Sequence, residues 1–457
     1  MASQRKRRRP GEDAPLTVEV RAVSGSVLGS FEVSERDGAR DLKVRLDGAP
    51  GRCQLLSAEG EVSDSMPLGQ LAGEDRHLQL TAVRRRMGFA CAAYLDGSLI
   101  FWDLEQKEVV QRLRCSLCQP QTPTCLLVHW ETSRLLCCLE DGTLYLWGPS
   151  DSDKSHHLLR VLQDTDLNES AAIRSKDAVA VDWPAGRVLV GTSSGRLRLW
   201  DLAVGEKCKV LSGHKSCVDV VRLSWPSRRA LSASRDRTVR VWDLDKGVSR
   251  ICRAHTSAVQ CLLVSWERRQ FLSAGLLEGL RLWQFDCLRT SQDFPQCRAS
   301  VSSCDVDWAQ QRAMTGSRDG GLTLWDMNLR EVLWSRSEHQ SMVEGVSLDP
   351  GGSRSLSVAA DAVCMWDHCG ALLHRIPGTG DEAGSVVLDW SCLWLLSAGA
   401  DAVVRLWSLG QAAKEEVGVP SQKAQATLLL ELAEVAAPCA YGAVCLSVEW
   451  ATARRLC

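Results

Sequence analysis

The sequence is poor in two of the three aromatic residue types, with 3 Tyr and 6 Phe among 457 residues. No apolar run approaches the roughly 18 residues of a membrane-spanning helix, which argues against helical membrane spans. The formal net charge is only −2, so the overall field of the chain favours neither nucleic acid nor a membrane surface. An apolar signal segment is also lacking at the N-terminus, so we expect a reducing compartment.

Cysteine is abundant by contrast, with 20 residues. In a small secreted chain such a number would suggest a disulfide framework. Here the cysteines are scattered through strand-like segments, for example Cys137, Cys138 and Cys217. We therefore expect buried free thiols in a cytoplasmic protein.

Tryptophan is the abundant aromatic residue, and its 17 positions follow a rule. One set ends a strand-like run in each of eight units, and its spacings are 41 or 42 residues except for the first two, which are 45 and 53. A second set mostly lies 17 residues before a member of the first. The first set is Trp102, Trp147, Trp200, Trp242, Trp283, Trp325, Trp366 and Trp407, and the second is Trp130, Trp183, Trp225, Trp266, Trp308, Trp390 and Trp450.

The stretch 230–244, ALSASRDRTVRVWDL, shows what each unit contains. Two short β-runs flank a polar turn, and the second run alternates apolar and polar residues like a strand with one buried face. Close copies occur at 188–202, 312–327 and 395–409. A unit of about 42 residues with four short strands is typical of a propeller blade.

The motifs FWDL, LWDL, VWDL, LWDM and MWDH resemble those of the tryptophan-aspartate (WD) repeat family, over some 370 residues. The resemblance implies an all-β fold, a WD-repeat β-propeller. Three units depart from Trp-Asp, at Gly148, Gln284 and Ser408, which is usual for the repeat.

Eight units are followed by one more strand-like run, residues 442–450. We expect this run to complete the first blade and close an eight-bladed ring, because closure removes exposed sheet edges. A seven-bladed ring, or a longer array cut short at Cys457, is the alternative. Closure would also release residues 77–83 to the preceding domain.

Residues 16–86 have a different pattern, with a hairpin at 16–34, a helix-compatible segment at 38–46 and a last strand at 77–83. This small α+β order is that of a β-grasp, and the segment resembles the ubiquitin-like family. No Gly-Gly terminus ends it, so conjugation through it is not expected. The expected domains are a disordered basic tail at 1–15, the ubiquitin-like domain at 16–86 and the propeller at 87–457.

The tail holds a basic run, which is typical of a solvated terminus or of a nuclear-import or RNA-binding patch. The run is Arg5, Lys6, Arg7, Arg8 and Arg9. It adds the nucleus as a second expected location and is the part of the chain where nucleic acid could bind.

Each unit of the WD family holds a His, a Ser or Thr, an Asp and the third-strand Trp in a hydrogen-bonded tetrad, because a buried Trp N–H and a turn carboxylate need partners. Two units match in full. They contain His214, Ser232, Asp236 and Trp242, and His339, Ser357, Asp361 and Trp366. Partial sets are His255-Ser273-Trp283, Thr315-Asp319-Trp325 and Ser397-Asp401-Trp407.

Residues of these types also form hydrolase triads, but here they recur with the structural period and sit within strands. We therefore expect structural tetrads, no catalytic residue and no enzyme. Cys115 and Cys118 form the only C-x-x-C pair, and no second pair accompanies it, so neither a metal nor a cofactor is expected. The insertion at 148–176, with His156 and His157, is expected to be an extended surface loop.

A rim for partners follows from the register of the repeat. In six units a polar residue stands six positions before the first-strand Trp, with an allowance for one deletion, and two arginines precede a turn Asp. By resemblance to the family, these residues form the recognition face. They are Thr124, Asp177, Asp219, Gln260, Ser302 and Glu344, with Arg235 and Arg318.

The sequence thus predicts a non-enzymatic scaffold whose propeller faces recruit proteins or peptides. Two alternatives stay open. One is a substrate adaptor in ubiquitin-linked protein turnover, with a ubiquitin-pathway component as partner. The other is an RNA- or ribosome-associated scaffold that binds through the basic tail.

Overall fold

The computed structural model describes most of the repeat region and parts of the N-terminal region. The described residues are 16–22, 27–34, 42, 53–57, 60–61, 68, 77–84, 88–104, 106–115, 122–149, 155–164, 172–252, 255–276, 279–285, 287–294, 300–350, 354–377, 385–390, 393–398, 403–409, 427–432 and 443–449. By internal contacts the chain divides into two compact units. Unit 1 is Met1–Gly88 with Asp389–Trp394 and Glu449–Cys457, and unit 2 is Phe89–Leu388 with Leu395–Val448.

The N-terminal region contains a five-stranded mixed sheet in the order β2-β1-β5-β3-β4. The hairpin of β1 and β2 is antiparallel, whereas β5 is parallel to β1 and antiparallel to β3. The strands are β1 (Leu16–Ala22), β2 (Val27–Val33), β3 (Cys53–Ser57), β4 (Gly60–Glu61) and β5 (His77–Arg84). The expected release of 77–83 to this region is confirmed.

Alternation explains how this sheet gains a core, since Leu16, Val18 and Val20 of β1 all point to the buried side. Leu78 and Leu80 of β5 join the same cluster. Of the helix expected at 38–46, only Leu42 is described, and it is fully buried in this core.

The repeat region forms eight four-stranded sheets, and the strand pairs recorded in them are antiparallel. Seven of the sheets are built from consecutive strands. They are β9 (Pro123–His129) to β12 (His156–Leu162), β13 (Val179–Asp182) to β16 (Lys207–Leu211), β17 (Val218–Ser224) to β20 (Val248–Cys252), β21 (Val259–Ser265) to β24 (Cys287–Asp293), β25 (Val301–Asp307) to β28 (Glu331–Ser337), β29 (Val343–Leu348) to β32 (Leu372–Pro377) and β33 (Val386–Asp389) to β36 (Thr427–Leu432).

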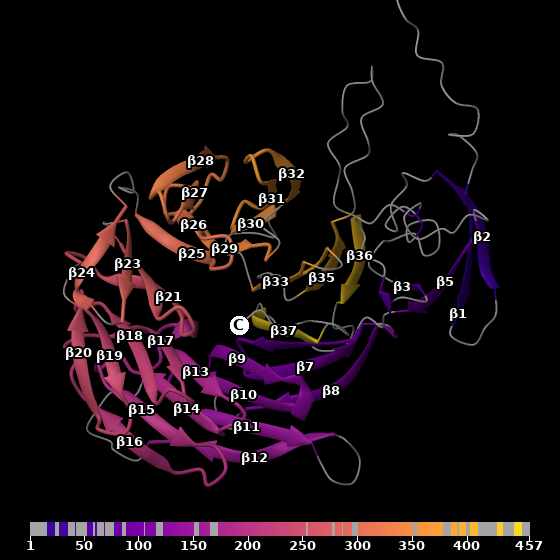
Figure 1. Ribbon diagram of the computed structural model, residues 1–457. Helices are drawn as coiled ribbons and strands as arrows, with labels where there is room; N and C mark the ends of the chain where they lie inside the picture. Colours follow the sequence, from indigo (N-terminus) through magenta and orange to yellow (C-terminus); the bar gives the residue numbers. More distant parts are fainter. Residues whose placement is uncertain are drawn as a thin grey trace, which may run out of the picture. The chain divides into compact units, whose positions relative to one another are not determined.

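The second and third strands of these seven sheets lie between the first and last strands just given. They are β10 (Arg134–Leu139), β11 (Leu144–Pro149), β14 (Arg187–Gly191), β15 (Leu197–Asp201), β18 (Arg229–Ser234), β19 (Val239–Asp243), β22 (Gln270–Gly275), β23 (Leu280–Gln284), β26 (Arg312–Ser317), β27 (Gly321–Asp326), β30 (Arg354–Ala359), β31 (Ala362–Asp367), β34 (Trp394–Ala398) and β35 (Val404–Ser408). Figure 1 shows the sheets side by side around a centre, with β13, β17 and β21 near it and β16, β20 and β24 outermost.

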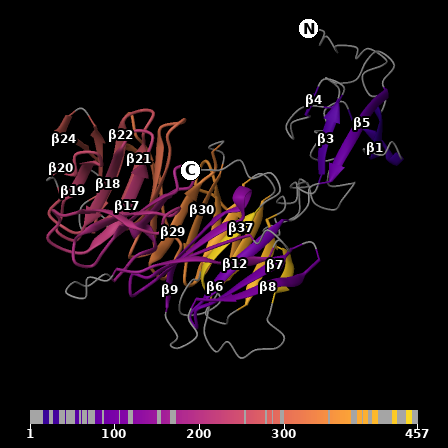
Figure 2. The same ribbon diagram turned by 90° about the horizontal axis from the view of Figure 1, so that it is seen from below.

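The eighth sheet joins the two ends of the repeat region. It contains β6 (Phe89–Tyr94), β7 (Ser98–Asp103) and β8 (Glu108–Arg114), and its first place is taken by β37 (Ala443–Glu449), in the order β37-β6-β7-β8. Figures 1 and 2 show the yellow β37 beside these early strands. The expectation that the last strand completes the first sheet is therefore confirmed. It leaves β6 without an open edge.

The repeating Trp packs between sheets. Trp242 of β19 lies in one core cluster with Leu189 and Leu199 of the preceding sheet, and Trp283 of β23 lies in the next cluster with Val241. Each such ring buries roughly 200 Å² and contributes about 5 kcal/mol of gross transfer free energy. Since each cluster needs two adjacent sheets, a single repeat cannot bury its own core.

The turn after the first strand of most sheets takes a left-handed residue. Gly186 has φ of +62° and its N–H donates to Trp183 O, while Ser133, Arg228 and Arg269 hold the same position with positive φ despite their side chains. The sequence repeat therefore carries a recurring left-handed backbone conformation as well as a recurring pattern of burial.

One expectation about the insertion is wrong. Residues 156–162 form β12, the outermost strand of its sheet, instead of an extended loop. His156 stacks on Phe101 with ring centroids 4.6 Å apart, and its backbone N–H donates to Gln111 Oε1. Burial lowers the pKa of His156. The strand pairs with β11 of its own sheet, and the contacts of His156 reach the neighbouring sheet.

Among the described residues, no helix is long and apolar enough to cross a membrane. Twelve described cysteines are free thiols, most of them buried. Cys115 is one of the buried ones, while Cys118 lies outside the described residues, as does Asp401 of the partial set of Ser397.

Candidate functional site

The first full set from the sequence comes together between the strands of one sheet. The Ser232 hydroxyl accepts from Trp242 Nε1 at 2.8 Å and pairs with His214 Nε2 at 2.7 Å. The other ring nitrogen of His214, Nδ1, lies 2.8 Å from Asp236 Oδ2. Strands β18 and β19 supply Ser232 and Trp242, while His214 precedes β17 and Asp236 lies in the turn, so the four residues tie two turns to a sheet.

Asp236 is the anionic end of this set. Burial alone would raise the pKa of its carboxyl, but hydrogen bonds from His214, Thr238 and the Lys215 N–H outweigh burial and hold the pKa well below its usual range. The carboxylate is therefore ionised at neutral pH and fixes the turn that contains it.

The second full set repeats the geometry in the sheet of β29 to β32. Ser357 pairs with His339 Nε2 at 2.7 Å and accepts from Trp366 Nε1 at 2.9 Å. Asp361 lies 3.2 Å from His339 Nδ1, and Arg375 donates to its other oxygen at 3.0 Å. Burial lowers the pKa of His339, although Asp361 opposes this shift.

The partial sets keep the Trp contact and lose other members. His255 pairs with Ser273 at 2.7 Å, and Ser273 accepts from Trp283 at 2.8 Å. Burial, and then Arg281, lower the pKa of His255 to about 4.

In two other sheets the Trp donates to the Thr or Ser of the set. The Trp325 Nε1–H donates to Thr315 at 3.0 Å, and the Trp407 Nε1–H donates to Ser397 at 3.0 Å. Asp319, expected in the set of Thr315, accepts instead from the Ser317 hydroxyl.

This geometry has a chemical consequence. The Ser232 and Ser357 hydroxyls are fully buried, and each lies between a Trp donor and a His ring. A substrate carbonyl has no approach to such an oxygen, while a nucleophile must be exposed to its substrate. The sets are arranged to satisfy buried polar groups.

Six of the predicted rim residues lie at or just before the start of a first strand, whereas Arg235 and Arg318 directly follow the second strands β18 and β26. Asp219 is 6% exposed, and both its oxygens accept from Arg235 Nε, at 3.2 and 3.0 Å. The Arg235 side chain is still 55% exposed. The hydrogen bond to Asp219 raises the pKa of Arg235, so a fixed cation faces solvent next to β17.

Cys217 belongs to the same group, although the sequence predicted it only as a buried thiol and not as a rim residue. Its thiol donates to Asp219 Oδ1 at 3.5 Å. Burial, and then Asp219, raise the pKa of this thiol to about 11, so it remains protonated at neutral pH.

The other rim residues are not gathered around Arg235. The Arg222 guanidinium of β17 donates to Asp177 at 2.9 Å, a contact between sheets that was missed because the two residues are 45 apart in sequence. Ser302 and Thr124 donate to backbone carbonyls.

Three rim residues remain more open. Gln260 is partly exposed, and Arg318 and Glu344 are exposed. The structure thus joins one pair of the eight predicted rim residues, Arg235 with Asp219, and leaves the others within their own sheets or against a neighbour.

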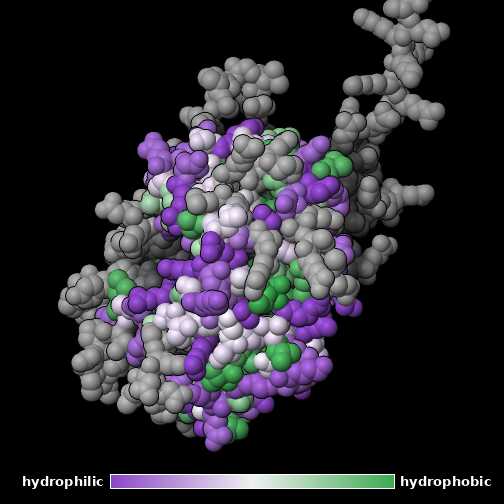
Figure 3. All heavy atoms as spheres, turned by 90° about the vertical axis from the view of Figure 1, so that its left-hand side faces the viewer, coloured by the Kyte–Doolittle hydropathy of each residue, from purple (hydrophilic) through white to green (hydrophobic). Residues whose placement is uncertain are grey.

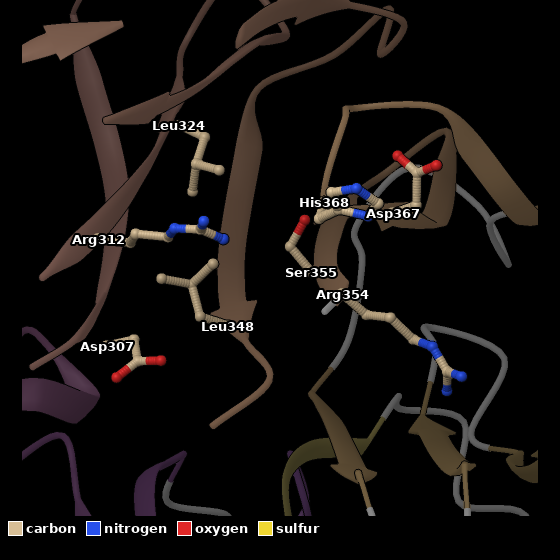
Figure 4. A pocket seen from close by; sticks show the side chains of 8 residues that line it. All are labelled: Asp307, Arg312, Leu324, Leu348, Arg354, Ser355, Asp367 and His368. Atoms are coloured by element: carbon tan, nitrogen blue, oxygen red, sulfur yellow. The ribbon is translucent and has the colours of Figure 1, made fainter. Parts of the chain in front are cut away.

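A small cavity lies between the sheets of β25–β28 and β29–β32 (Figure 4). Figure 4 shows Ser355, Asp367 and His368 on one side and Arg312 with Leu324 and Leu348 on the other. Its volume of about 10 Å³ is comparable to the space of one water molecule. The cavity is too small for an organic ligand.

Asp367, His368 and Cys369 are consecutive, and their ligand atoms lie within 4.8 Å of one another. Asp367 Oδ1 accepts from the N–H groups of Cys369 and Ala371, which is the role of a turn cap. The Arg336 guanidinium donates to the Cys369 carbonyl at 3.2 Å and brings a positive charge that opposes a bound cation. These three residues therefore serve to form a turn.

Comparisons with known proteins agree with this architecture. The family model described as WD domain, G-beta repeat, matches residues 205–243. No match is found among the curated proteins. Among solved structures, the crystal structure of the computationally designed Ika8 protein is similar, with a TM-score of 0.54 and 19% identity, covering 68% of this chain and 86% of that chain. At this identity the similarity supports the fold alone. The repeat match and the many four-stranded antiparallel sheets indicate a WD-repeat β-propeller.

Proposed function

We propose that the chain is an eight-bladed WD-repeat propeller that acts as a non-enzymatic scaffold and binds proteins or peptides through its rim. WD40 repeats generally mediate protein–protein interactions, which supports this class of function. One observation carries the choice of face. Arg235 is held by a buried carboxylate, yet more than half of its side chain is exposed. A preoriented, solvated guanidinium can bind a carboxylate with little further loss of side-chain entropy.

The scaffold proposal is tested by affinity purification with mass spectrometry on the full chain and on the Arg235→Ala, Arg318→Ala double variant. The matched control removes Arg134 and Arg160, which are also exposed and lie outside the predicted rim. We expect the rim variant to lose specific partners that the control retains. If both variants keep every partner of the unchanged chain, the rim is not the recognition face.

A second candidate is a substrate adaptor in ubiquitin-linked turnover. It is supported by the sheet order β2-β1-β5-β3-β4 with parallel β1 and β5, which is the arrangement expected for a β-grasp. Deletion of residues 16–83 should then remove proteasome or ligase components from the purified complex. An unchanged set of partners would count against the adaptor.

The free thiols support a cytoplasmic or nuclear location, which we also propose. The basic run Arg5 to Arg9 lies outside the described residues, so RNA or ribosome binding stays a prediction from the sequence. Removal of residues 1–10 should abolish such binding, which would also weaken steeply with salt.

A further inference from the structure

A crevice separates the sheet of β17–β20 from that of β21–β24 at one end of their strands. It comprises two adjoining hollows of about 310 and 280 Å³ that share Arg229, Arg269 and Phe285. Arg229 opens β18 and Arg235 directly follows the end of that strand, so the crevice lies at the opposite end from the rim. It is a separate candidate surface.

The floor of the crevice is apolar. Phe285 is 5% and Leu288 is 4% exposed, and both line the larger hollow. Trp266 lines the smaller hollow and stacks on Phe285 with ring centroids 5.3 Å apart. An aromatic floor of this kind takes up an apolar side chain of a ligand.

Charge around the floor is strongly one-sided. Four exposed cations line the larger hollow, and its one carboxylate is that of Asp243. The cations are Arg229, Lys246, Arg250 and Arg269. The whole chain carries a net charge of only −2, so this positive patch is local. Such a patch is complementary to an anion.

Arg229 differs from the equivalent arginine of the neighbouring sheet, because it does not form an ion pair with the aspartate opposite. Arg187 stands opposite Asp201 in the neighbouring sheet and forms an ion pair with it. Arg229 stands opposite Asp243 in the same register, but no ion pair joins these two described residues. Asp243 Oδ2 instead lies 4.0 Å from Lys246 Nζ. The Lys246 side chain is 77% exposed, so this ion pair contributes little stability.

The outer strands β20 and β24 border the crevice through Val248, Arg250 and Leu288. Figure 3 shows the side of the molecule on which these strands lie in Figure 1, where green apolar patches alternate with purple hydrophilic ones. Val248 is exposed at 58%. An outermost strand can also pair with an extended chain.

We propose that this crevice binds an acidic linear peptide, with an apolar side chain on Phe285 and Trp266 and carboxylates on Arg229 and Arg269. The floor includes the aliphatic Leu288 as well as Phe285 and lies below the cations, which suits an apolar side chain of a peptide. Nucleic-acid binding uses an extended basic surface, whereas these cations surround one crevice. The proposal goes beyond the scaffold function, because the rim takes no part in it.

The test uses the full chain and a fluorescein-labelled peptide of about ten residues with Asp and Glu around a central Leu-Phe pair. Fluorescence polarisation at low salt should show saturable binding that weakens as salt is added. A peptide with Asn and Gln in place of the acids should bind at least tenfold more weakly. Equal binding of both peptides, or no binding of the acidic one, overturns the proposal.

Variants then locate the site. Arg229→Ala and Arg269→Ala should each raise the Kd roughly tenfold, because each removes a charge-assisted hydrogen bond. Arg134→Ala is the matched control, since Arg134 also opens the second strand of its sheet and is exposed. It should leave the Kd unchanged, and so should the rim double variant Arg235→Ala, Arg318→Ala.

Asp243→Asn provides a gain of binding that damage to the fold cannot mimic. Asp243 Oδ1 accepts from the N–H groups of Asp245 and Lys246, and an Asn oxygen can accept in the same way. Removal of the one carboxylate in the crevice should lower the Kd about threefold. A Kd that rises, or stronger binding of a single-stranded oligonucleotide than of the peptide, contradicts the proposal.

Discussion

The replacement Ser232→Ala tests whether the tetrad stabilises the propeller. Ser232 has no exposed surface, Trp242 is 1% exposed and the His214 side chain is fully buried. The hydroxyl is the partner of both neighbours, at 2.8 and 2.7 Å. Its removal leaves the Trp242 N–H and one ring nitrogen of His214 without that partner in a place that water does not reach.

The magnitude follows from these two groups. A buried polar group that loses its partner costs about 1–3 kcal/mol, so the variant should lose roughly 2–6 kcal/mol of unfolding free energy. Unit 2 contains about 350 residues. At roughly 2 cal/mol/K per residue, a loss of about 3 kcal/mol lowers the melting temperature by about 4 °C.

Differential scanning calorimetry of the full chain at pH 7.5 measures this shift. Ser227→Ala is the control, because Ser227 is exposed and its hydroxyl makes only a 3.3 Å bond to the Ser224 carbonyl. Water replaces that bond, so the control should melt within about 1 °C of the unchanged chain. If the two variants melt together, the buried hydrogen bonds of the tetrad contribute no net stability and the reasoning fails.

Three further predictions concern pH, backbone and closure. Because the pKa of His255 is lowered to about 4, its unfolded form binds a proton first as pH falls, and the unfolding free energy should drop by roughly 3 kcal/mol between pH 7 and 4; urea unfolding of His255→Gln should show a smaller drop. Gly186→Ala should cost about 1 kcal/mol through its φ of +62° alone, since nothing lies within 4 Å of the added carbon, whereas Gly345→Ala, at a strand position without positive φ, should not show this loss in the same urea assay. Deletion of residues 443–449 should expose the edge of β6, lower the melting temperature and cause association detectable by light scattering; a monomer of unchanged stability would contradict this.

The repeat was readable from the sequence because its physical cause is local and periodic. A Trp at the end of each third strand, a turn residue before it and alternation within the strand are all spaced by fixed numbers of residues. Trp242 and Trp283 therefore identified their strands without any knowledge of their neighbours. The last strand at 443–449 was also predictable, since an open edge at β6 would be unfavourable.

The missed features share a different cause. β12 pairs with β11 of its own sheet, but its first residue, His156, is also held by Phe101 and Gln111, which belong to another sheet. The pairing of Arg222 with Asp177 likewise joins two sheets. No pattern within one repeat carries information about such a contact.

The sequence by itself determined the repeat and the tetrads, because strand alternation and the partners of a Trp N–H recur at fixed spacings in the units. It also determined the closing strand, because the first sheet would otherwise keep an open edge. Tertiary structure decided which polar residues remain open to a partner. Asp219 and Arg235 look like independent rim residues in the sequence, yet the fold buries one and exposes the other. Arg229 and Arg187 hold equivalent positions in their repeats, and only the packing of adjacent sheets places Arg229 on the wall of a crevice.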